Sequence, residues 1–422
     1  MAPATLPDSD WTQRHHPISF ARMIALKPIG RDIFESTSSA YPPRVPPRTY
    51  GGHVFAQAAY AAAKTVPKGL FIHNCTGHYL LVGNTNTPFR YHVQRVRDGG
   101  VYYLRKVEVF QNVNSSSSTT NSTEVDSEST KVGSLCFVAT VAFKRDESHK
   151  HGEGAKLSER RQDFAHQEAP HDHIDRTYAC VLRGKRFEDY PLVPGADGIW
   201  SDQLSVETWR LRTASFPGLE MRKVDMNKYL DLVGVPRGAG VRDRDRFEAA
   251  ARWKLLIFYR LLREQDMQQQ QQQQHQASPN NIINNEEKAE KDMVLLEDED
   301  DLNLHACAHL YACDRNSLYL AQRALGYGEV EVHVSSLAQT VIFHTPVAQL
   351  KMVDSQGRRK MFVQESWSSH SGDDRVAHNS RLWDYDTGTI IATTLQDGLL
   401  RVPVNSKAAL DLEASELRQS KI

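Results

Sequence analysis

The chain has 422 residues, which is enough for two or three domains of ordinary size. Its hydrophobic content of 40% and charged content of 24% are typical of a soluble globular protein, and a formal net charge of -1 gives no electrostatic reason to expect a nucleic-acid partner. Five cysteines without CxxC spacing indicate neither a disulfide framework nor a zinc ribbon, and the lack of an apolar run of about 18 residues excludes a transmembrane helix.

Residues 1–150 are expected to form the first structural unit. A Gly51–Gly52 pair opens a run of mostly small apolar residues that reaches Val66 and predicts a helix. Because alanine side chains let a sheet approach closely, we expect strands to enclose this helix. Four segments rich in β-branched and aromatic residues follow and predict antiparallel strands: 71–82, 89–96, 101–111 and 134–145.

Two polar segments interrupt this pattern. Residues 112–132 are rich in serine and threonine and have almost nothing to bury, which predicts a disordered hairpin tip. Residues 151–198 are predicted to form a polar connector. The connector contains His166, His171 and His173, but loop histidines without regular spacing are more often solvated than bound to a metal, so no metal site is predicted.

The second unit is predicted to span residues 199–410, with a large insertion at 214–300. Within the insertion, residues 246–264 carry apolar side chains at helical spacing and predict an amphipathic helix that packs onto its own domain. A glutamine run at 268–274 and an acidic run at 297–301 are typical of a solvated, low-complexity linker.

After the insertion the pattern of the first unit returns. Residues 302–325 predict a helix, and four strand-like segments follow it. A unit of this kind buries its helix only against a strongly curved sheet, and two units can pair their sheets into one. The expected fold is therefore α+β, with two tandem units that each wrap a central helix in a curved antiparallel sheet. The expected strands of the second unit are 331–346, 360–370, 376–385 and 389–402.

Five segments, in their order along the chain, resemble the acyl-CoA thioesterase II family, whose fold is a double hotdog. They are YGGHVFAQAAYAAAKTVP (50–67), VRDGGVYYLRKVEVFQ (96–111), HLYACDRNSL (309–318), FHTP (343–346) and TTLQDGLLR (393–401). Each motif is short, but the order and spacing together are specific. The resemblance covers most of the chain apart from the termini, the hairpin tip, the connector and the insertion. It implies hydrolysis of fatty acyl-CoA to a free fatty acid and CoA, without a metal, a cofactor or a covalent intermediate.

The resemblance also implies three catalytic residues. Members of the family use an aspartate, a hydroxyl residue and a glutamine to hold the attacking water. The aspartate falls on Asp314 in YACD, the glutamine on Gln396 in TLQDG, and the hydroxyl on Ser336, eight positions before the histidine of FHTP. Because the family more often has threonine at the hydroxyl position, Ser335 and Thr340 are the alternatives.

These residue types suit the hydrolysis of a thioester, whose carbonyl carbon is electrophilic and whose thiolate leaves readily. Asp314 lies in an apolar stretch, where desolvation makes a carboxylate a better base, and general-base assistance is worth about 10² to 10⁴ in rate. Ser336 and Gln396 can each donate and accept, and can therefore orient a water molecule. Strand alternation places Gln396 on the same face as Ile390 and turns Asp397 to the opposite face.

Other interpretations stay open. Without the resemblance, Asp314 could pair with Arg315 or Arg323, and Gln396 could cap backbone groups at the end of a strand. Hotdog folds also host enoyl-CoA hydratases and dehydratases, in which Asp314 would act with His309 and Gln396 would have no task. A third interpretation is an acyl-CoA-binding protein whose site has decayed, which the large insertion and the glutamine run favour.

Two further enzyme classes are disfavoured by the sequence. No GxSxG motif occurs, which argues against an α/β-hydrolase thioesterase. His305, His309 and Cys313 share one helix face, but the outer two are about 12 Å apart, too far for one metal ion with bonds of roughly 2 Å.

The last three residues, Ser420, Lys421 and Ile422, differ from the peroxisomal address Ser-Lys-Leu only in the final aliphatic side chain. Together with the resemblance, they predict that residues 411–422 form a tail that a peroxisomal import receptor binds. The peroxisomal matrix is therefore the expected location, and the cytoplasm is the alternative. The sequence leaves open whether the chain forms a homo-oligomer.

Overall fold

The computed structural model describes residues 18–41, 48–112, 133–147, 165–193, 216–235, 248–262, 301–315, 317–325 and 332–401. Three predicted features lie outside these ranges and stay predictions. They are the hairpin tip, apart from its first residue, the glutamine run and the C-terminal tail.

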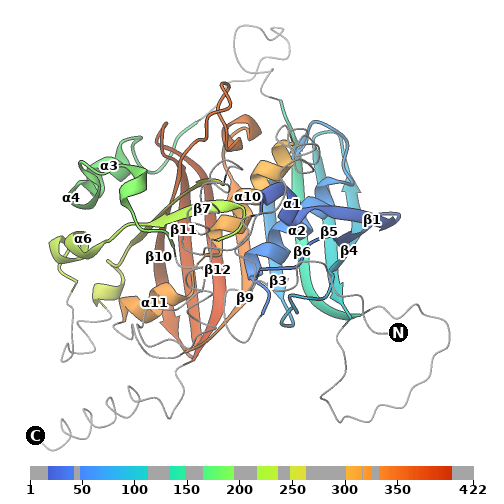
Figure 1. Cartoon of the computed structure of the whole chain (residues 1–422), viewed down its shortest axis with the longest axis horizontal. Coiled ribbons are helices and arrows are strands. Elements are labelled where there is room, and N and C mark those ends of the chain that lie inside the picture. The colour runs from blue at the N-terminus through green and yellow to red at the C-terminus, as the bar shows by residue number, and fades with distance from the viewer. Residues whose placement is uncertain are drawn as a thin grey trace, which may run out of the picture.

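A twelve-stranded antiparallel sheet organises the described residues (Figure 1). Its order is β1-β2-β4-β5-β6-β3-β9-β12-β11-β10-β8-β7, so it has the same order from each edge to the centre, where β3 pairs with β9. The strands of the first half are β1 (Leu26–Gly30), β2 (Ile33–Ser36), β3 (Leu70–Tyr79), β4 (Arg90–Asp98), β5 (Tyr102–Gln111) and β6 (Ser134–Arg145). Those of the second half are β7 (Leu219–Lys223), β8 (Leu255–Leu261), β9 (His333–Phe343), β10 (Phe362–Gly372), β11 (Arg375–Asp384) and β12 (Thr389–Arg401).

Two helices, α2 (Gly51–Ala63) and α10 (Leu302–Cys313), pack against each other inside the sheet. Almost every side chain of both helices is buried, as the alanine content of α2 predicted. No described helix is long and apolar enough to cross a membrane. The shorter helices are α1 (Phe20–Ile24), α3 (His173–Thr177), α4 (Ala179–Leu182), α6 (Asn227–Leu232), α11 (Tyr319–Ala324), and the 3₁₀ helices η2 (Phe187–Asp189) and η5 (Val347–Leu350).

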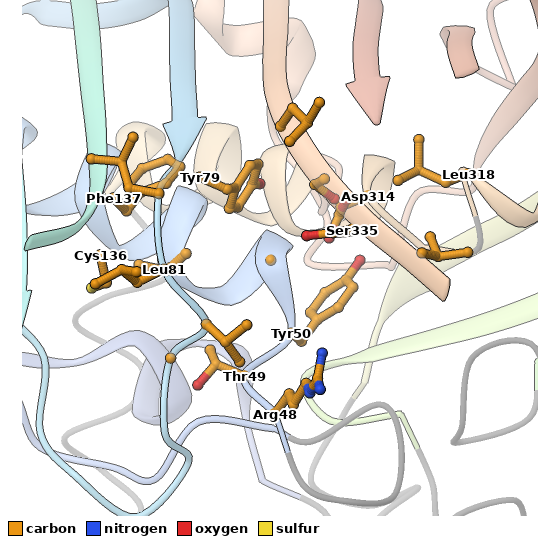
Figure 2. A pocket seen from close by; sticks show the side chains of 18 of the residues that line it. Arg48, Thr49, Tyr50, Tyr79, Leu81, Cys136, Phe137, Asp314, Leu318 and Ser335 are labelled. Carbon is orange, nitrogen blue, oxygen red and sulfur yellow. The ribbon is translucent and has the colours of Figure 1, made fainter. Parts of the chain in front are cut away.

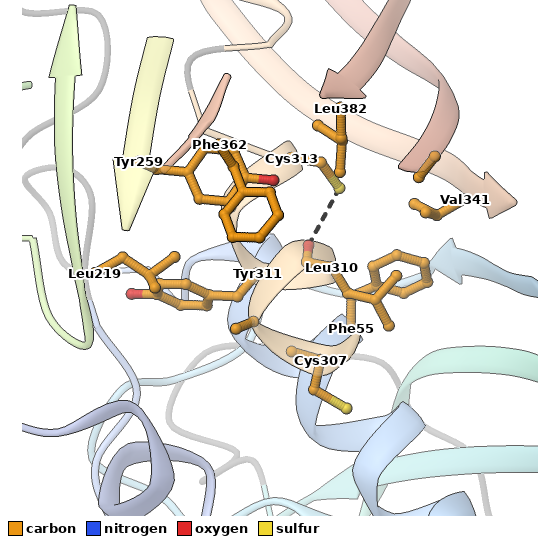
Figure 3. Close-up of a cluster of buried hydrophobic side chains, with 14 of the residues drawn as sticks. Phe55, Leu219, Tyr259, Cys307, Leu310, Tyr311, Cys313, Val341, Phe362 and Leu382 are labelled. Carbon is orange, nitrogen blue, oxygen red and sulfur yellow. Dashed lines mark hydrogen bonds between the residues drawn. The ribbon is translucent and has the colours of Figure 1, made fainter. Parts of the chain in front are cut away.

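The core around α10 draws side chains from both helices and from the sheet (Figure 3). The buried side chains labelled there include Phe55, Tyr259, Cys307, Leu310, Tyr311, Val341, Phe362 and Leu382. Because residues from both halves of the chain meet in this cluster, the halves share one core. The predicted α+β architecture, two helix-and-sheet units joined through their sheets, is confirmed.

The predicted insertion is wrong in its central part. Residues 246–264 were expected to form a helix, but strand β8 occupies Leu255–Leu261 and pairs with β7 and β10. The paired strands β7 and β8 hold the same place in the second half as β1 and β2 hold in the first. The first five residues of β8 are all buried, and such a continuous apolar run fits a strand covered on both faces as well as it fits a helix.

The helix predicted at 302–325 is divided in two. Helix α10 ends at Cys313 and α11 begins at Tyr319, so Asp314 terminates a helix instead of lying within one. The Ser317 hydroxyl donates to the Asp314 carbonyl at 3.1 Å, and serine is a weak helix former that competes for backbone groups in this way.

The described part of the connector is folded and docks on β10. It contains α3, α4 and η2, and its anchor is the buried carboxylate of Glu365. Glu365 accepts hydrogen bonds from His173 Nε2 at 3.1 Å, Tyr178 Oη at 2.6 Å and Trp383 Nε1 at 3.2 Å. Burial alone would raise the pKa of Glu365, but the bonds from His173 and Tyr178 and the charge of Arg381 lower it to about 2. The ionised carboxylate therefore ties the connector to the sheet.

The substitution Glu365→Gln should lower the free energy of unfolding by about 2 to 3 kcal/mol at pH 7. Because the folded pKa lies below the ordinary value of 4.5, this stabilisation is complete above about pH 4.5 and is lost as the pH falls toward 2. Urea unfolding at several pH values should therefore show the gap between wild type and variant narrowing in acid. Glu108→Gln, which removes one partner of the exposed pair with Lys106, is the control; a gap that does not depend on pH would contradict the assignment.

Candidate functional site

Asp314 lies where the end of α10 meets the beginning of α2. Its Oδ2 accepts a hydrogen bond from the backbone N–H of Gly52 at 2.7 Å. Gly52 is the second residue of α2, so the carboxylate faces the positive end of that helix dipole. Only 7% of Asp314 is exposed, and the ionised carboxylate is therefore stabilised mainly by protein groups and little by bulk water.

Two glycines allow this close approach of the helices. A Cβ atom on Gly51 would lie 2.9 Å from Asp314 Oδ2, and one on Gly52 would lie 2.7 Å from the Tyr311 carbonyl oxygen. The Tyr311 oxygen belongs to the backbone of α10 and cannot move without moving that helix. The Gly51–Gly52 pair, which the sequence marked only as a helix start, is thus part of the site.

Gln396 and Ser336 form one hydrogen-bonded group with Asp314. Gln396 Nε2 donates to Asp314 Oδ1 at 2.6 Å and to Ser336 Oγ at 2.9 Å. Both amide hydrogens have a partner, which fixes the orientation of the side chain. Gln396 is 1% exposed and faces inward, whereas Asp397 pairs with Arg375. The structure therefore brings the three predicted site residues together and confirms the predicted alternation along β12.

A β-bulge turns Ser336 into this group. Strands β9 and β12 pair residue by residue from Phe343 to Ala338, and then the register shifts so that Gly398 lies opposite Ser336. The extra residue, Leu337, reverses the alternation of side chains along β9. Simple alternation from Gln339 would have turned position 335 inward, so the sequence pattern could not decide between the two serines.

The two alternative hydroxyl residues occupy other positions. Thr340 Oγ1 is 3.1 Å from Thr76 Oγ1, across the pairing of β9 with β3. Ser335 lines the adjacent cavity (Figure 2), but among the described residues it makes no hydrogen bond to Gln396.

A cavity of about 240 Å³ opens beside Asp314 and Ser336 (Figure 2). Its lining comes from both halves of the chain, and Asp314 and Arg48 are the charged residues among the described lining. Most of the wall is apolar, which suits a hydrocarbon chain next to a polar reaction centre. The apolar lining includes Val54, Leu81, Phe89, Phe137, Leu318 and Leu337.

The neighbouring acidic side chains stay protonated. Burial, and then the charge of Asp314, raise the pKa of Tyr79 well above its ordinary value, and the same two causes raise the pKa of the Cys313 thiol. Tyr79 Oη donates to Gln339 Oε1 at 3.0 Å, and Gln339 Nε2 donates to Cys313 Sγ at 3.1 Å. Neither group is a thiolate or phenolate at neutral pH, so Asp314 is the candidate base.

Two of the histidines weighed as metal ligands, His309 and His171, are engaged by protein groups. His309 lies between Tyr259 Oη and the Leu350 carbonyl, each 2.9 Å from one ring nitrogen. His171 Nδ1 is 3.1 Å from the Gly388 carbonyl. Within the described ranges, no three His, Cys, Asp or Glu side chains gather as a metal-ligand group.

The opposite end of the helix pair is built differently. There the start of α10 meets the end of α2, and Lys64 Nζ lies 3.4 Å from Asp301 Oδ2. The Asn303 side chain accepts from the Ile72 N–H at 2.9 Å and donates to the Leu70 carbonyl at 3.0 Å. These bonds serve the backbone of β3, so the chemistry of Asp314 is not repeated at this end.

Comparisons with known proteins found matches to part of the sequence. Residues 41–143 match the model of the acyl-CoA thioesterase N-terminal domain. Over 89 residues the chain is 29% identical to acyl-coenzyme A thioesterase 8 of Mus musculus, an alignment that covers 21% of this chain and 27% of the relative. The same values hold for the protein of that name from Rattus norvegicus. The chain thus aligns with about a quarter of the length of these curated relatives.

Solved structures extend the likeness to the whole fold. Acyl-CoA thioesterase II TesB2 from Mycobacterium marinum is 17% identical with a TM-score of 0.50, over 91% of this chain and 99% of that one. A conserved protein of unknown function with a hot dog fold from Alicyclobacillus acidocaldarius is 14% identical with a TM-score of 0.51, over 91% and 98%. The match over residues 41–143 supports the resemblance to the acyl-CoA thioesterase II family that the motifs indicated. The fold of the chain is the double hotdog that this resemblance implied.

The motif resemblance pointed to the side chains of the candidate site but missed a backbone group. Gly52 contributes its backbone N–H. Because almost every residue has a backbone N–H, such a donor cannot be recognised from the type of residue in a motif. The Gly51–Gly52 pair was the sequence signal for this contact. Glycine is a poor helix former, so two glycines at the start of a helix indicate a close approach by another part of the chain.

The substitution Gly52→Ala should cost about 1 to 3 kcal/mol in the free energy of unfolding, because the added methyl group would lie 2.7 Å from the Tyr311 carbonyl oxygen. Gly100→Ala is the matched control, since a Cβ there meets nothing within 4 Å. Urea unfolding measures both. Equal stability of the two variants would mean that α2 and α10 do not approach as closely as described.

Proposed function

We propose that the protein hydrolyses fatty acyl-CoA thioesters to a free fatty acid and CoA. The observation that carries this proposal is the hydrogen-bonded group of Asp314, Gln396 and Ser336 beside a mostly apolar cavity. These are the three residue types that the family uses to hold the attacking water. The match of residues 41–143 to the acyl-CoA thioesterase N-terminal domain supports the same activity.

Asp314 acts as the general base. Its carboxylate oxygens accept hydrogen bonds from the Gly52 N–H and from Gln396 Nε2, and these bonds orient the carboxylate beside the cavity. Ser336 Oγ accepts from Gln396, so its own hydrogen is available to a water oxygen. A water that donates to Asp314 and accepts from Ser336 retains one lone pair for attack, which is the orientation that hydrolysis needs.

The reaction then needs no covalent enzyme intermediate. The water oxygen forms a bond to the thioester carbonyl carbon while one water proton passes to Asp314. The tetrahedral intermediate collapses with cleavage of the carbon–sulfur bond, and CoA leaves as a thiolate that takes up the proton. The products are one fatty acid and one CoA thiol for each thioester and water consumed.

A hotdog hydratase is less well supported by the same site. That reaction would pair Asp314 with His309 across a carbon–carbon double bond. Both ring nitrogens of His309 have protein partners, and burial lowers its pKa to about 3. His309 therefore stays neutral and engaged, and Gln396 would have no task.

The substitution Asp314→Asn should lower the rate of thiol release from acyl-CoA at least a hundredfold, because the general base is lost. The measurement is thiol release by purified protein with acyl-CoA substrates of increasing chain length. Asp397→Asn is the matched control, since Asp397 is a neighbour of Gln396 that pairs with Arg375. Urea unfolding of both variants verifies that they are folded.

Three outcomes of that assay separate the candidate functions. Release by the wild type and the control but not by Asp314→Asn supports hydrolysis with this base. A folded and active Asp314→Asn variant would refute the assignment of the base. Tight binding of acyl-CoA without release by the wild type would favour a binding protein.

The substitution Ser336→Ala should lower thiol release about tenfold or more, whereas Ser335→Ala should change it less than threefold, because Ser336 alone of the two accepts the Gln396 hydrogen bond. The pair is matched in residue type, chain position and cavity lining. A larger loss in Ser335→Ala would show that the other serine supplies the hydroxyl.

The peroxisomal matrix remains the proposed location. The proposal depends on Ser420, Lys421 and Ile422, which lie outside the described residues. Its partner would be the import receptor for that tripeptide.

A further inference from the structure

The last turn of α10 carries carbonyl groups that have no partner further along the helix. Two of them are satisfied close by. The Leu310 carbonyl accepts from Cys313 Sγ at 3.2 Å (Figure 3), and the Ala312 carbonyl accepts from the Arg315 N–H at 3.1 Å. Local bonds thus account for two of the last four carbonyls.

Two side chains from other elements take the remaining pair. Tyr50 Oη donates to the Tyr311 carbonyl at 2.8 Å, and Gln364 Nε2 donates to the Cys313 carbonyl at 2.9 Å. Tyr50 is the residue before α2 in the first half, whereas Gln364 comes from β10 in the second half. The turn that ends in Asp314 is therefore held from both halves of the molecule.

Both donors are buried and their surroundings fix them in place. Tyr50 is 1% exposed and Gln364 is 0% exposed, so water does not compete for either bond. Gln364 Nε2 also lies 3.3 Å from Ser380 Oγ, which is 2.7 Å from Thr394 Oγ1. Thr394 precedes Gln396 by two residues on β12, so these bonds link the turn of Asp314 to the strand of its partner.

We propose that Tyr50 and Gln364 are positioning residues for the Asp314 carboxylate, an inference that rests on the proposed hydrolysis. Tyr50 holds the carbonyl three residues before Asp314, and Gln364 holds the carbonyl directly before it. A shift of that turn would move the carboxylate relative to Ser336. Catalytic groups must be held within about 0.5 Å, and a misplacement of about 1 Å can cost up to 10² in rate. Tyr50 lines the cavity, but its hydroxyl, like the Gln364 amide, donates to a backbone carbonyl of this turn.

The test removes each donor while keeping the shape of the side chain. Tyr50→Phe and Gln364→Met should each lower kcat for thiol release about tenfold, with KM changed less than twofold. Tyr178→Phe is the matched control, because it also removes a buried hydroxyl donor, to Glu365, away from Asp314. Tyr178→Phe should leave kcat unchanged, even if it lowers the free energy of unfolding as much as Tyr50→Phe or Gln364→Met does.

A second arm distinguishes action through Asp314 from a general loss of order. In the Asp314→Asn background, Tyr50→Phe and Gln364→Met should cause no additional loss of the residual rate. Additional loss there, or unchanged kcat of both variants in the wild-type background, would overturn the proposal. A decrease of kcat in Tyr178→Phe as large as in Tyr50→Phe would do the same.

The proposed hydrolysis fails separately, if the wild type releases no thiol. Urea unfolding verifies that each variant is folded under the assay conditions. Should Gln364→Met be unfolded, Tyr50→Phe, which loses a single oxygen atom, decides the question.

Discussion

The hydrogen bond between the Gly52 N–H and the Asp314 carboxylate is the constraint on which the site depends. It requires the start of α2 to touch the end of α10, and so requires the two helices to run antiparallel in one shared core. Alanines along α2 and glycines at its start permit that approach. The pairing of β3 with β9 then holds the two helix-bearing units in register.

The duplicated architecture explains why the two ends of the helix pair differ. An approximate twofold relation brings a helix start against a helix end at both places. At one end the carboxylate of Asp314 occupies the junction. At the other, Lys64 and Asp301 form an ion pair and Asn303 bonds to the backbone of β3. Once two units are joined in one chain, the residues at each junction can change independently. One junction can then carry the proposed catalytic group while the other stabilises the packing of the helices.

The sequence predicted the parts of this fold that follow from local periodicity. The central helices, most strands and the inward face of Gln396 are of this kind. Strand β8 was mistaken for a helix because a strand covered on both faces has no alternation to reveal it. Ser336 could not be separated from Ser335 because a bulge depends on the partner strand and not on the residues that bulge. Long-range backbone contacts, such as that of Gly52, leave no pattern of their own.

The charge of the site depends on which of its acidic side chains keep their protons. Tyr79 and Cys313 lie beside Asp314 and are buried with it, so burial and the carboxylate charge both keep them protonated. The negative charge therefore stays on one group, which is oriented by a helix start and by an amide whose two hydrogens are both used. An isolated base with fixed neighbours needs little rearrangement when it accepts a proton. The rigid junction of the two units thus supplies the preorganisation that the proposed hydrolysis requires.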